Sequence, residues 1–143
     1  MLPLVVGMPV RLTDTIDKKR HLYRYRRGVV VDWVLHPAET STDIENGCLL
    51  SHMPLTVYVK FPGASWVIHQ DLEPGVYPIT PVSRTWLVNK YTGVKARRTG
   101  YFLIPDFAST AHMIQGTSLD AVLCAVTDNP IAAYVGYSRA KNK

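Results

Sequence analysis

The densest group of side chains with a chemical use lies near the amino terminus. Residues 18–27 hold six cations interleaved with one histidine and two tyrosines: Lys18, Lys19, Arg20, Arg24, Arg26, Arg27, His21, Tyr23 and Tyr25. Cations neutralise phosphates and aromatic rings stack on bases, so this mixture is typical of a surface that contacts nucleic acid. Taken alone, the cluster is explained equally well as a solvated basic loop without a ligand.

The second candidate is a serine motif near the carboxy terminus. Residues 136–140 read Gly-Tyr-Ser-Arg-Ala, which differs at its last position from the Gly-x-Ser-x-Gly turn that exposes a hydrolase nucleophile. No Asp and His follow it, so a serine hydrolase is not expected. The chain also contains neither Gly-x-x-x-x-Gly-Lys-Ser/Thr nor Gly-x-Gly-x-x-Gly. Any nucleotide chemistry would therefore need a phosphate-binding loop from another segment.

The sequence patterns give little support for a metal site or for disulfide bonds. The five histidines show no paired ligand spacing, and Cys48 with His52 is a lone pair that lacks two further ligands. One bridge between Cys48 and Cys124 would be no disulfide framework for a chain of this size. We therefore predict no metal site and an intracellular protein, nuclear or organellar if its source is eukaryotic.

The elements that must position these residues are mostly short strands. Alternation of apolar and polar residues or β-branched runs predicts strands at 4–12, 28–35, 55–61, 65–69, 76–82 and 94–104, separated by Gly and Pro turns. Gly7 and Pro9 favour an edge strand or a bulge for the first of these. The composition of residues 36–53 predicts a loop whose role we cannot assign. Such a pattern favours a small, strongly bent sheet or barrel.

The pattern changes after Pro105. Asp106 is a candidate cap for a helix over residues 107–115, which Gly116 would end. The apolar run within 120–126 predicts a buried strand, and Asn129 followed by Pro130 predicts a helix over 131–140. Helix, strand and helix in this order are typical of an α/β sheet, and the piece is too short to be a whole domain. We therefore expect a β-rich module joined to a portion of an α/β domain.

Composition limits the function classes. The chain has 143 residues, of which 47% are hydrophobic and 19% charged, so it can bury a core and is not expected to be disordered. Its apolar runs are far shorter than the roughly 18 residues that cross a bilayer, so we predict no membrane association. The formal charge of +5 weakly favours a polyanionic partner.

Two motifs in the last 45 residues indicate a family. Residues 98–120 contain Ala-Ser-Thr-Ala-His-Met-Ile-Gln-Gly-Thr-Ser-Leu-Asp, which resembles motif V of the Pif/RecD-like superfamily 1 DNA helicases, where Thr-x-His-Lys-Ser-Gln-Gly is usual. Residues 133–140, Ala-Tyr-Val-Gly-Tyr-Ser-Arg-Ala, resemble motif VI. Residues 6–13 and 27–30 are more loosely similar to family segments that precede motif V. The resemblance covers most of the chain.

The resemblance implies a fold and a set of roles. It implies a small β-barrel inserted into the second RecA-like lobe of a P-loop NTPase motor, with residues 1–14 as a strand of that lobe, 15–93 as the barrel and 94–143 as the end of the lobe. It implies that Arg139 reaches the γ-phosphate of ATP as a catalytic arginine finger. It places Gln115, Gly116, Thr117 and Tyr134 at the nucleotide cleft, and Thr110 and His112 beside single-stranded DNA.

The resemblance also implies what the chain lacks. The lysine that cradles phosphates and the acid that binds Mg²⁺ belong to a first lobe with no counterpart here, so ATP and Mg²⁺ would be bound only through that missing lobe. Met113 and Ile114 replace the usual Lys-Ser, which removes a cation and a hydroxyl from motif V. In this context Arg24, Arg26 and Arg27 become candidates for a second DNA contact.

We therefore predict a carboxy-terminal fragment of an ATP-dependent DNA helicase that is inactive alone and whose partners are single-stranded DNA and the missing amino-terminal lobe. Two alternatives stay open: a free-standing nucleic-acid-binding β-barrel module without motor activity, and a decayed fragment. Without the paired motifs, His112 would be an ordinary helix histidine, Gln115 a surface residue and Arg139 a cation that complements a helix dipole.

Overall fold

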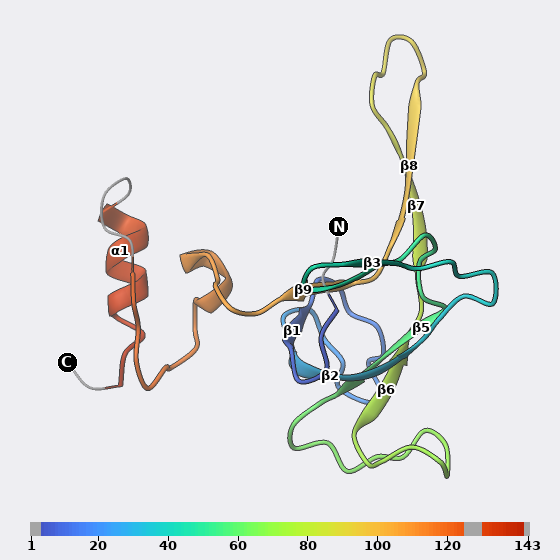
Figure 1. Cartoon of the computed structure of the whole chain (residues 1–143). Helices are drawn as coiled ribbons and strands as arrows, with labels where there is room; N and C mark the ends of the chain where they lie inside the picture. Colours follow the sequence, from blue (N-terminus) through green and yellow to red (C-terminus); the bar gives the residue numbers. More distant parts are fainter. Residues whose placement is uncertain (1–3, 125–129, 142–143) are drawn as a thin grey trace. The chain divides into compact units, whose positions relative to one another are not determined.

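The computed structural model describes residues 4–124 and 130–141, and the chain forms two compact units, Met1–Pro105 and Asp106–Lys143 (Figure 1). From residue 4 onward the first unit contains nine strands: β1 Pro9–Leu12, β2 Arg27–Val34, β3 Thr42–Ile44, β4 Gly47–Leu49, β5 Thr56–Lys60, β6 Val76–Ile79, β7 Val82–Leu87, β8 Lys95–Gly100 and β9 Leu103–Pro105. The described residues of the second unit form a 3₁₀-helix, Ala111–Ile114, and one α-helix, α1 Pro130–Tyr137.

A five-stranded antiparallel sheet with the order β6-β5-β2-β1-β9 organises the first unit. Its core is a cluster of buried apolar side chains, listed along the chain as Met8, Val10, Leu12, Leu22, Val30, Val57, Val59, Phe61, Ile79 and Leu103. Trp66 packs beside this cluster, with its ring centroid 6.4 Å from that of Phe61 and 6.0 Å from that of Tyr77. All the residues of this cluster belong to the first unit, so the sheet has a core of its own.

The alternation predicted for residues 55–61 is confirmed from Thr56 onward, whereas Leu55, expected on the buried side, is 44% exposed and precedes β5. Val57, Val59 and Phe61 are buried, whereas Tyr58 is only half-buried and Lys60 is exposed. Gly28 on β2 lies close to the backbone and side chains of β5. A Cβ added to Gly28 would lie 2.5 Å from Val59 Cγ1 and 3.1 Å from the Lys60 carbonyl oxygen. The close approach of β2 and β5 therefore requires a glycine at this position.

The first predicted strand is shorter and lies elsewhere in the sheet than expected. Gly7 has φ +86° and the Met8 amide donates to the Val5 carbonyl, so residues 5–8 form a turn and β1 begins only at Pro9. β1 lies between β2 and β9, which corrects the prediction of an edge strand. Proline is tolerated there because it is the first residue of the strand.

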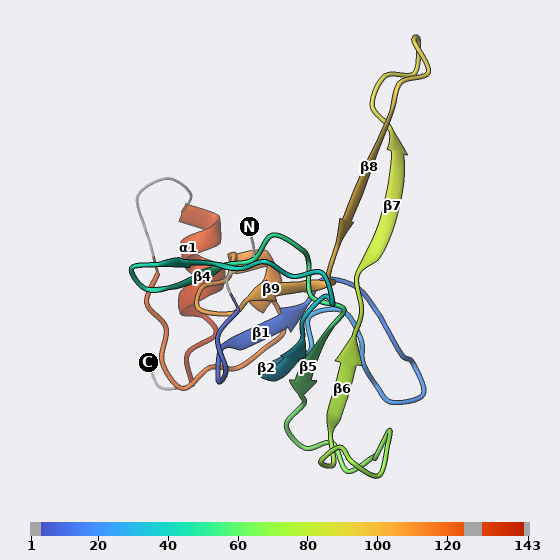
Figure 2. The same cartoon turned by 45° about the vertical axis from the view of Figure 1, so that its right-hand side comes forward.

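Other predicted segments also need correction. Residues 36–53, predicted as a loop, contain the β3–β4 hairpin, and residues 65–69, predicted as a strand, have no strand structure. The predicted strand 76–82 is split at Thr80 and Pro81, and the predicted strand 94–104 is split between β8 and β9. β7 and β8 pair only with each other and form a hairpin that extends away from the five-stranded sheet (Figures 1 and 2).

In the second unit the predicted helix and strand are largely absent. Helical structure is confined to Ala111–Ile114 rather than 107–115, and Ser109 Oγ instead donates to Asp106 Oδ1 at 3.3 Å. So short a segment nucleates a helix poorly. Residues 120–124 form no strand because no partner strand is present in the described part of this unit, while 125 and 126 lie outside the described residues. α1, Pro130–Tyr137, confirms the helix predicted over 131–140 but ends before Ser138.

The described chain is thus mostly β-sheet with one short α-helix. A closed barrel requires its edge strands β6 and β9 to pair, and no such pairing occurs among residues 4–124 and 130–141. The predicted division at residues 14 and 93 stays a prediction. No helix in the described part of the chain is long and apolar enough to cross a membrane. The same residues contain no group of three His, Cys, Asp or Glu side chains suited to a metal ion.

Candidate functional site

The basic cluster lies on the connection between β1 and β2, which we call the basic loop, residues 15–26. Leu22 is fully buried and anchors the loop to the core. Its amide donates to the Asp17 carbonyl at 2.8 Å, and its carbonyl accepts from the Ile16 amide at 2.9 Å. His21 and Tyr25 adopt positive φ values of 58° and 72°, which turn the backbone on either side of this anchor. The loop therefore has a fixed centre, and Lys18, Lys19 and Arg24 are exposed around it.

Arg26 connects the basic loop to the turn after β5. Its Nη1 donates to the His21 carbonyl at 2.9 Å, and its Nη2 donates to the Pro62 carbonyl at 3.4 Å. The guanidinium carbon also lies 5.8 Å from the centroid of the Phe61 ring. With both ends of its fork bonded to backbone carbonyls, Arg26 has a structural use in holding the basic loop, and its DNA contact stays a prediction.

Arg24 is the predicted DNA-contacting arginine with the most open surroundings. It is exposed, its guanidinium carbon lies 4.7 Å from the centroid of the Tyr25 ring, and it forms no ion pair within the part of the chain that the structure describes. Arg27, the first residue of β2, is also exposed and lies opposite Arg11 in the β1–β2 register. Both are exposed cations in or directly after the basic loop, which also carries the 46%-exposed Tyr23, and exposed cations and rings are the groups that nucleic-acid binding uses.

Arg20 forms an ion pair with Asp17. Its Nη1 lies 2.6 Å from Asp17 Oδ2, and this hydrogen bond, partly opposed by desolvation, lowers the pKa of Asp17 below its usual value. Asp17 also accepts from the Lys19 amide at 2.9 Å. The ion pair thus shapes the tip of the basic loop and neutralises one of its cations.

The motif V residues lie on and after the 3₁₀-helix. The Thr110 carbonyl accepts from the Met113 amide at 3.0 Å, and the backbone of His112 lies within the helix. Gln115 is exposed, and Gly116 has φ +81°, a conformation that favours glycine. Thr117 ends the turn, since both its amide and its hydroxyl donate to the Ile114 carbonyl, the hydroxyl at 2.7 Å.

The motif VI residues lie on α1 and directly after it. Tyr134 is 75% exposed. The Arg139 side chain donates to Ser138 Oγ from Nε at 3.2 Å and from Nη2 at 3.0 Å, while the Ser138 hydroxyl donates to the Val135 carbonyl at 2.9 Å. Arg139 forms no ion pair with an acid among the described residues, so its charge is available to an anion. Sequence reasoning missed Ser138 as the residue that orients Arg139, although its position next to the arginine is a usable signal.

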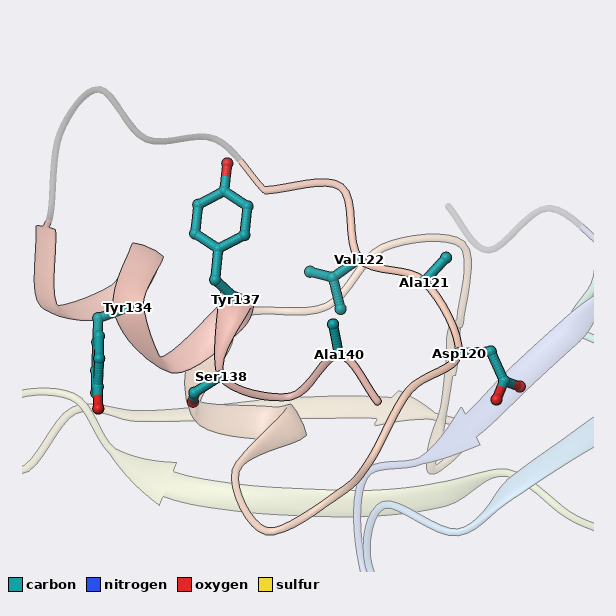
Figure 3. A pocket seen from close by; sticks show the side chains of 7 residues that line it. All are labelled: Asp120, Ala121, Val122, Tyr134, Tyr137, Ser138 and Ala140. Carbon is teal, nitrogen blue, oxygen red and sulfur yellow. The ribbon is translucent and has the colours of Figure 1, made fainter. Parts of the chain in front are cut away.

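The structure brings the end of motif V against motif VI. The Leu119 amide donates to the Arg139 carbonyl at 2.8 Å, and the Lys141 amide donates to the Leu119 carbonyl at 2.9 Å. Beside this junction is a hollow of about 600 Å³, shown in Figure 3, lined by Asp120, Ala121, Val122, Tyr134, Tyr137, Ser138 and Ala140. Of the predicted nucleotide-binding residues, only Tyr134 lines it, and Gln115, Gly116 and Thr117 do not.

No protein-family model and no curated protein matches the sequence. Solved structures do. A structure described as the basis for DNA unwinding at forked double-stranded DNA by two coordinating Pif1 helicases has a TM-score of 0.60 and 20% identity, covering 99% of this chain and 26% of that chain. Pif1 helicase from Bacteroides, in complex with ADP-AlF3 and single-stranded DNA, has a TM-score of 0.59 and 18% identity, covering 99% of this chain and 28% of that chain.

The chain spans about a quarter of the length of these helicases. Because the likeness covers 99% of this chain, it includes both compact units and not the β-sheet alone. The resemblance indicated by motifs V and VI is thereby confirmed at the level of fold, and it is consistent with a carboxy-terminal part. The chain has the fold of a portion of the Pif1-like helicases.

Proposed function

We propose that the chain is the carboxy-terminal portion of an ATP-dependent DNA helicase, comprising an inserted β-sheet module, which in the described residues is open between β6 and β9 rather than a closed barrel, and the end of the second RecA-like lobe. The observation that carries this proposal is the fold shared over 99% of the chain with Pif1 helicases, one of them bound to ADP-AlF3 and single-stranded DNA. The order of motifs V and VI supports it independently.

Within this proposal Arg139 is the arginine finger. ATP and Mg²⁺ would be held by a first lobe, whose phosphate-binding loop this chain lacks. The surroundings of Arg139 suit the role, because Ser138 orients the guanidinium and no described acid neutralises it. A planar cation placed at the γ-phosphate stabilises the charge of the transferring phosphoryl group. Gln115, Gly116, Thr117 and Tyr134 would border the same cleft.

The DNA role is assigned to two places. Thr110 and His112 of motif V would lie beside the strand, and Arg24 and Arg27 of the basic loop and β2 would contact phosphates. Arg26, the third predicted arginine, supports this surface by holding the basic loop in place. Intracellular location, in the nucleus or an organelle of a eukaryote, follows only if the helicase assignment holds.

A second function is favoured by one observation. The first unit has its own five-stranded sheet and its own core, so it contains what an autonomous binding domain needs. The chain would then be a nucleic-acid-binding module without motor activity. The two functions share DNA binding and differ in the need for Arg139.

The DNA-binding part is tested by fluorescence anisotropy of the full chain with single-stranded and double-stranded oligonucleotides across a salt series. We expect salt-dependent binding that prefers single strands. The double change Arg24→Ala and Arg27→Ala should weaken it, and removal of two phosphate contacts should reduce the salt slope by about 1.4. Lys60→Gln is a control, because Lys60 lies on β5 and pairs with Glu73 at 2.6 Å.

Two outcomes contradict the DNA-binding part. The first is no binding at low salt by a sample whose circular dichroism shows it to be folded. The second is a double variant that binds with the affinity and salt slope of the unchanged chain.

A further inference from the structure

The β7–β8 hairpin carries an unusual charge composition. Residues 82–100 contain five cations, Arg84, Lys90, Lys95, Arg97 and Arg98, and no acid. Every residue of β7 is exposed, and so are Lys95, Arg97 and Arg98 on β8. The hairpin extends away from the five-stranded sheet, as Figures 1 and 2 show from two directions. It is therefore a projecting, purely cationic element.

The register places like charges side by side. Arg84 lies directly opposite Arg98, and two residues toward the turn Trp86 lies opposite Ala96 on the same face. Arg97 lies opposite Thr85 and Lys95 opposite Leu87 on the other face. Like charges directly across an antiparallel pair destabilise it, so stability of the hairpin does not explain this arrangement.

Only the base of the hairpin is neutralised. Arg84 forms an ion pair with Asp14, and its guanidinium carbon lies 4.7 Å from the centroid of the Phe102 ring. Arg97 donates to Ser83 Oγ at 3.3 Å. Lys90, Lys95 and Arg98 form no ion pair in the described ranges 4–124 and 130–141. Arg84 thus fixes the hairpin to the rest of the first unit, while Lys90 and Lys95 toward the turn and Arg98 opposite Arg84 stay available.

Two aromatic rings accompany these charges. The Trp86 side chain is 50% exposed, and Tyr91 is fully exposed in the turn between the strands. Asn89 Oδ1 holds that turn by accepting from the Tyr91 amide at 2.8 Å and the Thr92 amide at 3.3 Å. Leaving large rings in water forgoes the stabilisation of burying them, so an external partner for them is the simpler explanation.

We propose that the β7–β8 hairpin is a binding surface for single-stranded nucleic acid, separate from the basic loop and from motifs V and VI. Lys90, Lys95 and Arg98 contact phosphates, and Trp86 and Tyr91 stack on unpaired bases. The exposed rings favour a single strand over a duplex, because the faces of paired bases are covered within the stack. The proposal does not depend on motor activity.

Tryptophan fluorescence tests the stacking. The chain has three tryptophans, and Trp33 and Trp66 are partly buried against the core, so Trp86 is the one most open to a ligand. Addition of oligo(dT) to the full chain should quench the emission, and Trp86→Phe should lose most of this change. Trp86→Ala should weaken binding measured by anisotropy about tenfold, since a base stack accounts for such a factor.

Matched charge variants test the phosphate contacts. Lys95→Gln and Lys60→Gln each remove one charge from an exposed strand residue of the first unit, but only Lys95 lies on the hairpin. Lys95→Gln should lower the salt slope by about 0.7, and Lys60→Gln should leave it unchanged.

Three outcomes overturn the proposal. The first is oligo(dT) quenching of Trp86→Phe to the same extent as the unchanged chain, and the second is an equal change of the salt slope in Lys95→Gln and Lys60→Gln. The third is a duplex of equal length that binds as tightly as the single strand and loses the same factor in affinity on Trp86→Ala. The proposal is also separable from the function proposed above. If Arg24→Ala with Arg27→Ala weakens binding and the hairpin variants do not, the function proposed above is supported and the hairpin proposal is rejected. If the hairpin variants weaken binding and the Arg24 and Arg27 variant does not, the hairpin proposal is supported and the DNA contact of the basic loop is rejected.

Discussion

Arg26 offers a way to separate folding from binding in the basic cluster. The side chain makes two hydrogen bonds to backbone carbonyls, at 2.9 and 3.4 Å, and lies over the Phe61 ring at 5.8 Å. Exposed contacts of these kinds contribute about 0.5–1.5 kcal/mol for each hydrogen bond and about 0.5–1 kcal/mol for the ring contact. Because the contacts are long or partly exposed, we expect Arg26→Ala to lower the free energy of unfolding by about 2 kcal/mol.

This loss is large enough to measure. For a unit the size of Met1–Pro105, 1 kcal/mol corresponds to a shift of about 4–8 °C in Tm, so Arg26→Ala should unfold about 10 °C earlier than the unchanged chain. Arg24→Ala loses only one ring contact, at 4.7 Å from Tyr25, and should shift Tm by no more than about 3 °C. Thermal unfolding followed by circular dichroism at fixed salt measures both.

Arg26→Lys is the matched control. It retains the positive charge but not the planar fork that reaches two carbonyls, so it should lose most of the stability while DNA binding keeps its salt dependence at temperatures where the variant is folded. Equal Tm values for Arg26→Ala and Arg24→Ala would refute the structural role of Arg26. Full stability of Arg26→Lys would show that charge alone, rather than the two hydrogen bonds, accounts for the effect.

Two further predictions concern packing and pH. Gly28→Ala should lower the free energy of unfolding by about 1–3 kcal/mol, because its Cβ meets Val59 and the Lys60 carbonyl. Gly100→Ala on β8 is the control and should leave the free energy nearly unchanged, because nothing lies within 4 Å of the added Cβ. Urea unfolding compares the two variants, and equal midpoints would contradict the close approach of β2 and β5. Burial raises the pKa of Tyr101 to about 12 from its ordinary value of 10. The unfolded chain therefore loses this proton first, and the stabilisation present below about pH 10 is lost as pH rises toward 12. An absorbance titration of the eight tyrosines should show one late step that Tyr101→Phe lacks, and an unchanged titration curve would contradict the burial of this hydroxyl.

The sequence predicts parts of the fold well where periodicity is strong. The alternation along residues 55–61 and the β-branched run after Gly28 identify β5 and β2, because one face of each strand must be buried. It does not predict that Thr80 and Pro81 divide a strand, since the division depends on where each strand finds a partner. It also does not show that β1 is internal, because strand order is set by long-range pairing.

The site shows a similar division. Residue type alone identifies Arg24, Arg26 and Arg27 as equivalent cations, whereas the structure gives Arg26 two carbonyl partners and leaves Arg24 exposed. The predicted helix before Gly116 is mostly absent, because the segment is too short to overcome the cost of nucleation, and Ser109 Oγ donates to the carboxylate of Asp106 instead. The role of the β7–β8 hairpin depends on pairing register, which relates Arg84 to Arg98 across 14 positions.

The helicase assignment is tested most directly by DNA-stimulated ATP hydrolysis in an assembly of this chain with the first lobe of an active Pif1 helicase. The account predicts hydrolysis that needs single-stranded DNA and falls by a factor on the order of 10³ or more in Arg139→Ala. Lys141→Gln, which removes a nearby charge paired with Asp120 at 2.7 Å, should leave the rate unchanged. An assembly that binds ATP and DNA but does not hydrolyse ATP, or one that hydrolyses equally with Arg139→Ala, would contradict the account.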